Sequence, residues 1–151
     1  ATKIMQEISK PIPPVSENEY EEKAWGIQSQ GGPFDLVTIN RPKVGDFDVK
    51  LDIHFCGVCH TDVHIGQNHL GVTMFPVVPG HEMVGVVSEV GAKVTKVKVG
   101  DKAGIGAMSD SCLDCSACEN SDEQYCLKGK CVSTYNDRKR YSHIGGNPDT
   151  Q

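Results

Sequence analysis

Residues 112–126 read CLDCSACENSDEQYC, a run in which four cysteines follow the spacing C-x2-C-x2-C-x7-C: Cys112, Cys115, Cys118 and Cys126. A loop this short cannot bury enough apolar surface to order itself, so a bound metal has to supply the ordering free energy. Thiolate sulfur suits Zn²⁺, and four cysteines around one tetrahedral ion are the usual structural zinc site. The sequence therefore predicts a zinc-binding lobe, which we place at residues 108–131.

Other interpretations of these cysteines stay open but are less favoured. Gaps of two residues leave little room for unstrained disulfide bridges. The N-terminal residues also lack the long apolar run of a secretory leader. Iron–sulfur clusters of the bacterial ferredoxin type use C-x2-C-x2-C-x3-C-Pro, whereas here the last gap is longer and Leu127 follows the final cysteine. Zinc is thus preferred over disulfides, free thiols or an iron–sulfur cluster.

The composition limits the class of protein. The chain has 151 residues and a net charge of −5, which argues against nucleic acid or an anionic membrane as its main partner. No window approaches the roughly 20 apolar residues that a membrane span needs. Seven cysteines without an evident leader favour a reducing compartment, and we expect the cytoplasm. Sixteen glycines and eight prolines favour a β-rich fold with many turns.

The pattern along the chain predicts short strands separated by turns. Val49, Leu51, Ile53 and Phe55 alternate with polar residues, which is typical of a half-buried strand. A polar, proline-bearing arm is expected at the N-terminus, and a basic run near the C-terminus is interpreted as a solvated face. We expect a mainly β fold resembling a small barrel. The expected segments are the arm at 1–20, strands at 24–29, 36–39, 49–55, 83–90 and 103–107, a strand-like stretch at 94–99, a short helix within 56–64, and the basic run at 138–140.

A second group of metal-binding residue types lies earlier in the chain. Cys59 follows a predicted strand, and His81 and Glu82 follow a Pro-Gly turn. A catalytic zinc takes about three protein ligands and keeps one position open. Cys59 and His81 are candidates for two of them, and Asp62 or Glu82 could orient a ligand from outside.

Thr61 and His64 are candidates for a proton relay, since a hydroxyl beside a metal-bound alcohol and an imidazole behind it can carry a proton away. Simpler interpretations compete with each of these assignments. A lone cysteine such as Cys59 is often a small buried hydrophobic residue, and a lone histidine is often a satisfied core or surface residue. Cys56 also competes with Cys59 for the ligand role, and spacing alone does not separate the two.

Three motifs together resemble a known family, the zinc-dependent medium-chain alcohol dehydrogenases. Residues 57–64, GVCHTDVH, resemble the family's catalytic-zinc motif, and residues 76–85, PVVPGHEMVG, look like its Gly-His-Glu motif. The cysteine lobe has the spacing of the family's structural zinc loop. Cys126 and residues 133–137 and 148–151 look most like the cinnamyl alcohol dehydrogenase branch. The resemblance extends over roughly residues 20–151.

The resemblance implies a role for each matching residue. It makes Cys59 the catalytic zinc ligand with His81, and Cys56 a packed thiol. The other roles it implies are a relay of Thr61 and His64, metal-site carboxylates at Asp62 and Glu82, and a cofactor-diphosphate contact at His60. Cys131 falls where relatives often have an aromatic wall of the substrate pocket. His69 falls where this branch often has an aspartate near the relay.

The resemblance also implies the fold and the reaction. Residues 21–151 are expected to form a GroES-like, partly open barrel with short helices and the zinc lobe. A Rossmann domain and a third catalytic cysteine are expected outside this chain, so we expect the chain alone to be inactive. The implied reaction is reversible oxidation of a primary alcohol to an aldehyde, with zinc as Lewis acid. Hydride transfer to NADP is expected rather than to NAD.

The full-length enzyme is expected to be a homodimer or homotetramer. Two alternatives are carried beside this interpretation. One is a non-catalytic, zinc-stabilised β-module that binds a partner protein, for which the pair Cys59 and His81 would be unnecessary. The other is a zinc-free member resembling quinone reductases, against which Cys59 and the cysteine lobe both argue.

Overall fold

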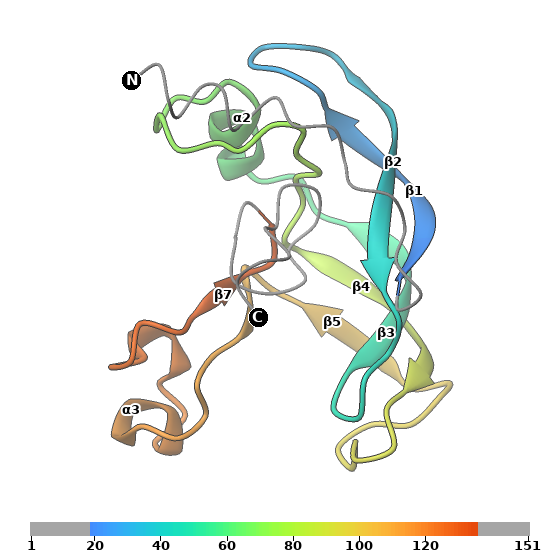
Figure 1. The fold of residues 1–151 in the computed structure, drawn as a ribbon, viewed down its shortest axis with the longest axis vertical. Helices are drawn as coiled ribbons and strands as arrows, with labels where there is room; N and C mark the ends of the chain where they lie inside the picture. Colours follow the sequence, from blue (N-terminus) through green and yellow to red (C-terminus); the bar gives the residue numbers. More distant parts are fainter. Residues whose placement is uncertain (1–18, 136–151) are drawn as a thin grey trace.

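The computed structural model describes residues 19–135, and Figure 1 shows how their elements are arranged. The N-terminal 18 residues of the expected arm lie outside this range, as do the basic run at 138–140 and the motif at 148–151. The elements, in order, are β1 (Glu19–Ile27), β2 (Phe34–Pro42), β3 (Val49–Cys56), α2 (His60–Gly66), β4 (Met83–Val90), β5 (Lys102–Ile105), β6 (Met108–Asp110), α3 (Ser116–Glu119), the 3-10 turn η1 (Glu123–Tyr125) and β7 (Val132–Ser133).

Within the described residues the strands form three antiparallel sheets, β1–β2, β3–β4–β5 and β6–β7. The β1–β2 hairpin curves beside the β3–β4–β5 sheet, and the lobe with α3 and β7 projects from the other side (Figure 1). Gly85 makes the central pairing possible, because a Cβ there would lie 2.1 Å from the carbonyl oxygen of Asp52. The mainly β fold with short helices and a separate cysteine lobe is therefore as predicted.

A small apolar core connects these parts. Ile27 and Val77 exchange two backbone hydrogen bonds, of 2.8 and 2.9 Å, which join the end of β1 to the loop that precedes β4. Ile65 of α2 and Tyr135 belong to the same buried cluster as these two residues. Val77 is completely buried. The core thus holds α2, the loop before β4 and the segment after β7 against one another.

Two local predictions are wrong. No strand forms at 94–99, where the backbone instead closes turns through the bonds Val94 N–H to Gly91 O and Asp101 N–H to Lys98 O. The strand β3 is confirmed, but its apolar face is not half-buried throughout, since Phe55 is 75% exposed. The register between β3 and β4 shifts twice, and among the described residues nothing covers this end of the face. None of the described helices is long and apolar enough to cross a membrane.

Candidate metal centres and the adjoining pocket

The four lobe cysteines meet around a common point, with all their sulfur atoms within 4.8 Å of one another. The sulfur of Cys118 lies 3.5 Å from that of Cys115 and 3.7 Å from that of Cys112. A tetrahedral zinc with bonds of about 2.3 Å would separate its sulfur ligands by about 3.8 Å. A disulfide would need about 2.05 Å. The arrangement therefore fits a tetrahedral metal ion and does not fit disulfides.

The protein around the lobe lowers the pKa of Cys115 and Cys126 and raises that of Cys112. Backbone N–H groups of Cys112 and Lys130 point at the Cys126 sulfur and lower its pKa to about 6. A hydrogen bond with the nearby Asp114 carboxylate raises the pKa of the Cys112 thiol, and burial adds to that effect. Cys131 lies against this cluster, but its thiol donates to the carbonyl oxygen of Glu123 at 3.1 Å. The four cysteines therefore form a closed, mostly buried set of ligands.

A second cluster joins Cys59, His81 and Glu82, whose ligand atoms also lie within 4.8 Å of one another. Cys59 is the N-cap of α2, and the other two residues immediately precede β4. The antiparallel pairing of β3 with β4 brings these segments together and continues into a bond from Gly57 N–H to Glu82 O. Gly57 also makes room for the carboxylate, since a Cβ there would lie 2.2 Å from Glu82 Oε2.

Asp62 holds this second cluster in place. Its buried carboxylate accepts hydrogen bonds from the backbone N–H groups of Cys59 and Gly80, both at 3.0 Å. It also lies 3.2 Å from Nδ1 of His81, and a proton on that nitrogen would be donated to Asp62. This tautomer leaves Nε2 of His81 with a lone pair for a metal. Asp62 thus orients one ligand directly and the other through the backbone.

The charges of this second cluster also favour metal binding. The Thr61 hydroxyl lies 3.5 Å from the Cys59 sulfur and, with His81, lowers the pKa of the Cys59 thiol. Burial works to lower the pKa of His81, but the neighbouring Cys59 and Asp62 outweigh it and raise that pKa. Without a metal the two groups tend towards a thiolate–imidazolium pair. A divalent cation could replace the proton on the imidazole.

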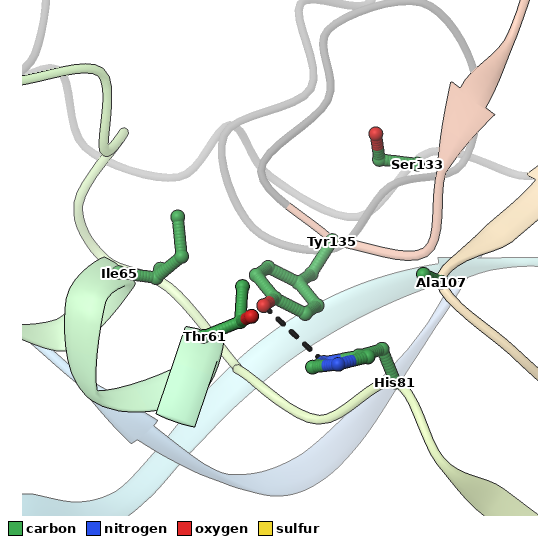
Figure 2. A pocket seen from close by; sticks show the side chains of 6 residues that line it. All are labelled: Thr61, Ile65, His81, Ala107, Ser133 and Tyr135. Carbon is green, nitrogen blue, oxygen red and sulfur yellow. Dashed lines mark hydrogen bonds between the residues drawn. The ribbon is translucent and has the colours of Figure 1, made fainter. Parts of the chain in front are cut away.

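A pocket of about 250 Å³ adjoins the cluster, and Figure 2 shows its lining residues: Thr61, Ile65, His81, Ala107, Ser133 and Tyr135. Its wall combines apolar surface with hydroxyl groups and the imidazole. The Tyr135 hydroxyl lies 3.4 Å from Nδ1 of His81, as the dashed line in Figure 2 marks. The space is suited to a small molecule with one polar end.

Tyr135 was not among the predicted site residues. Its only signal in the sequence was membership of the branch-like motif at 133–137, which suggested no role. The fold brings Tyr135 to the site because residues after β7 pack on Ile65 and Val77. Burial raises the pKa of its phenol, and the nearby Asp62 carboxylate adds to that effect, so Tyr135 stays a neutral hydrogen-bonding group.

The other predicted residues lie around α2. Thr61 lines the pocket, whereas His64 lies further along the helix with its Nδ1 3.0 Å from Nδ1 of His69. His60 is exposed, and its ring centre lies 4.7 Å from that of His64. No direct hydrogen bond joins Thr61 to His64 in the described part of the chain. A proton passing between them would therefore need a bridging group.

Cys56 does not belong to either cluster. It was expected to be a packed thiol, but the residue is exposed at the end of β3. Its sulfur lies over Gly80, where an added Cβ would come within 2.9 Å of it. The structure therefore separates the two thiols that spacing could not, since only Cys59 lies with His81 and Glu82.

Comparison with known proteins agrees with this arrangement. Residues 45–146 match the family described as "Alcohol dehydrogenase GroES-like domain". The chain is 50% identical over 113 residues to the NADP-dependent alcohol dehydrogenase C 1 of Mycolicibacterium smegmatis, a match that covers 75% of this chain and 32% of that protein. The chain thus spans about a third of the length of such relatives.

Two solved structures show the same fold. A cinnamyl alcohol dehydrogenase (SbCAD4) from Sorghum bicolor is similar with a TM-score of 0.76 and 38% identity, over 84% of this chain and 36% of that one. The CAD from Helicobacter pylori, complexed with NADP(H), is similar with a TM-score of 0.72 and 35% identity, over 80% of this chain and 34% of that one. The predicted GroES-like architecture and the branch are therefore confirmed.

Proposed function

The chain belongs to the alcohol dehydrogenase GroES-like domain family, and from this premise we propose that it carries the metal-binding part of an NADP-dependent alcohol dehydrogenase. The proposed reaction is reversible oxidation of a primary alcohol to an aldehyde, with hydride transfer to NADP. The proposal extends to this chain the activity named for its M. smegmatis relative. We place the enzyme in the cytoplasm, where a reducing environment suits seven free thiols.

The observation that carries the proposal is the cluster of Cys59, His81 and Glu82 beside the pocket. One thiol, one imidazole and one carboxylate form a donor set suited to zinc, and a fourth position would face the substrate. Zinc bound there supplies Lewis acidity, which favours the ionised alcohol and polarises the aldehyde. The closed lobe has four thiols and no open position, so its proposed role is structural.

The residues of this chain are proposed to have two roles, metal binding and proton transfer. Cys59, His81 and Glu82 hold the ion in this chain, with Glu82 as third donor in the absence of the cysteine that the resemblance implies outside it. The buried Asp62 keeps Cys59 and His81 in position. We propose that Thr61, which lines the pocket, accepts the proton of the alcohol hydroxyl and passes its own towards His64. Because no direct bond joins Thr61 to His64, a bridging hydroxyl or water completes the relay. Reversal of the same steps returns the proton in aldehyde reduction.

Cofactor binding is proposed to need more protein than the described residues provide. All their sheets are antiparallel, whereas a dinucleotide-binding fold uses a parallel sheet. His60, exposed on α2 next to the metal cluster, is the proposed contact to the NADP diphosphate. The complex of the H. pylori protein with NADP(H) supports this choice of cofactor. We therefore propose that the chain of 151 residues alone does not oxidise alcohols.

The test is zinc content per chain by elemental analysis, together with intact mass of the same sample against the expected 16.4 kDa. We expect about two zinc ions in the parent chain and about one in Cys59→Ser. Cys56→Ser is the matched control, because its thiol lies outside the cluster, and it should keep both ions. A parent chain with one zinc, or loss of zinc in Cys56→Ser alone, would contradict the assignment.

A further inference from the structure

Three imidazoles gather along α2, outside the cluster of Cys59, His81 and Glu82. The ring centre of His64 lies 4.7 Å from that of His60 and 5.2 Å from that of His69, with both pairs edge-on. His69 comes back over the helix because Asn68 adopts a left-handed backbone, with φ of 54°, and because His69 N–H bonds to His64 O at 2.9 Å. The resemblance implied a position near the relay for His69, but not the direct contact between its ring and that of His64.

The two Nδ1 atoms of His64 and His69 are 3.0 Å apart. A metal bound by two imidazoles at about 2.0–2.1 Å, in neighbouring positions at a right angle, would hold those nitrogens about 2.9 Å apart. The rings therefore already stand at the spacing that two cis ligands of one ion require. In the metal-free protein, a single proton between the two nitrogens satisfies them. A cation would displace this proton and lie to one side of the line that joins the two nitrogens, and each ring would turn to point its Nδ1 lone pair at the ion.

The backbone around this pair is held by its own contacts. Asn68 Oδ1 accepts a hydrogen bond from the N–H of Thr73 at 3.0 Å, and the Thr73 hydroxyl donates to Ile65 O at 2.8 Å. These bonds fix the turn that carries His69 against the end of α2. Little ordering of the chain would then be needed on binding, which favours affinity. His69 is exposed and His64 is half-buried, so water can complete the coordination from one side.

We propose that His64 and His69 form a further metal site, a two-imidazole chelate for a divalent cation of the Ni²⁺ or Cu²⁺ type. Such ions accept imidazole nitrogen in square or octahedral arrangements, which contain right-angled pairs of ligands. The site is separate from both zinc-type clusters and does not depend on the proposed dehydrogenase activity. If the proposed dehydrogenase activity holds, an ion bound between His64 and His69 would occupy Nδ1 of His64. It would then block proton transfer from Thr61 through His64.

Calorimetric titration of NiCl₂ into the zinc-loaded chain tests the proposal. Zinc loading keeps nickel off the thiolates, and nickel does not oxidise them. We expect one saturable nickel site in the parent chain. Removing either arm of a chelate removes the gain from the second, intramolecular contact, so His69→Asn and His64→Asn should each bind about tenfold or more weakly.

His54→Asn is the matched control, because His54 is an exposed histidine on β3 and does not belong to the group of three imidazoles along α2. It should bind nickel like the parent chain. The side chain of His69 is exposed to solvent, so His69→Asn should disturb folding less than His64→Asn does. Circular dichroism and zinc content should confirm that the variant folds. Unchanged nickel affinity in His69→Asn, equal loss in His54→Asn, or no saturable binding by the parent chain would overturn the proposal.

A second measurement locates the ion independently of stability. Ni²⁺ is paramagnetic, and the ring C–H signals of the histidines that bind it should broaden first in NMR spectra. We expect His64 and His69 to broaden at substoichiometric nickel, and His54 to remain sharp. Broadening that begins at His54 or at His81 would overturn the assignment. We expect His69→Asn to keep its zinc ions. A failure of the nickel proposal would therefore show in nickel binding, whereas a failure of the proposed function would show in the zinc content.

Discussion

The two cysteine-containing clusters of this protein differ in how they are built. The lobe takes all four thiols from one continuous segment, and three of them are buried. The cluster of Cys59, His81 and Glu82 takes its ligands from the start of α2 and from the approach to β4, and it opens onto a pocket. The first has a complete tetrahedral set of donors, whereas the second leaves room for a further ligand.

This difference suits the lobe to stabilising the fold and the open cluster to binding and activating a substrate. A closed, local site can order the loop that carries it but offers no place for a substrate. An open site needs support from elsewhere, and here Asp62, Gly57 and Tyr135 provide it through hydrogen bonds and space. Changes in the lobe should therefore affect metal retention and local order. Changes around the open site should affect reactivity and pH dependence.

The largest effect is expected from Cys118→Ser in the lobe. Zinc binding to such sites is worth about 10 kcal/mol or more, and a hydroxyl in place of a central thiolate removes most of it. We expect loss of one zinc ion and rapid proteolytic cleavage within residues 108–131, while the Cys59 site keeps its ion. Zinc analysis and limited proteolysis followed by mass spectrometry measure both. Cys131→Ser is the control, and cleavage as fast in that variant would show that the four-thiol set is not what orders the lobe.

The next effect is expected from Asp62→Ala at the open site. The change leaves two backbone N–H groups and the His81 ring without their acceptor, which should lower the free energy of unfolding by about 2–4 kcal/mol. It should also release zinc from the open site and not from the lobe. Urea denaturation and zinc content are the measurements. Asp62→Asn keeps one acceptor oxygen and should lose less; equal losses in the two variants would argue against the hydrogen-bonding role.

Thr61→Ala should change reactivity more than stability. The Thr61 hydroxyl lowers the pKa of Cys59, so its removal should move the pH dependence of Cys59 alkylation to higher pH in the metal-free chain. The thiolate is the reacting form, and alkylation at neutral pH should slow a few-fold. Iodoacetamide labelling with peptide mapping measures this. Cys56 in the same sample is the control, and equal slowing at Cys56 would contradict the explanation.

The smallest effect is expected from Tyr135→Phe. Loss of one hydroxyl beside His81 should cost about 1 kcal/mol at neutral pH. Burial raises the pKa of Tyr135 above its ordinary value of 10.0, so the neutral phenol stabilises the fold below pH 10. That contribution is lost as pH rises towards the folded-state pKa. The gap between parent and variant in urea midpoint should therefore narrow above pH 10; a gap that stays constant would show that the phenol is not held neutral by the fold.

Much of the fold was predictable because its signals are local. Alternation at 49–55 predicted β3, and the apolar run at 83–90 predicted β4, both of which the structure confirms. The prediction at 94–99 was wrong although its signal was also local, since Val94, Val97 and Val99 stand among polar residues as in a strand. The structure instead has local turns at both ends of this stretch. The exposure of Phe55 could not be predicted from the sequence either. The alternation of a strand indicates which residues share a face, but not what covers that face.

The cysteine lobe was accessible from spacing alone, because four ligands within one short loop can meet around an ion without help from distant parts of the chain. The sequence already made Asp62 a candidate for orienting a metal ligand, but the contacts of Asp62, Tyr135 and His69 were decided only by the tertiary structure. Asp62 acts on residues before β4, Tyr135 reaches His81 through packing of the chain after β7, and His69 meets His64 through a left-handed turn. Pairing of distant strands and packing on a shared core set these distances, and no local pattern of residues encodes them.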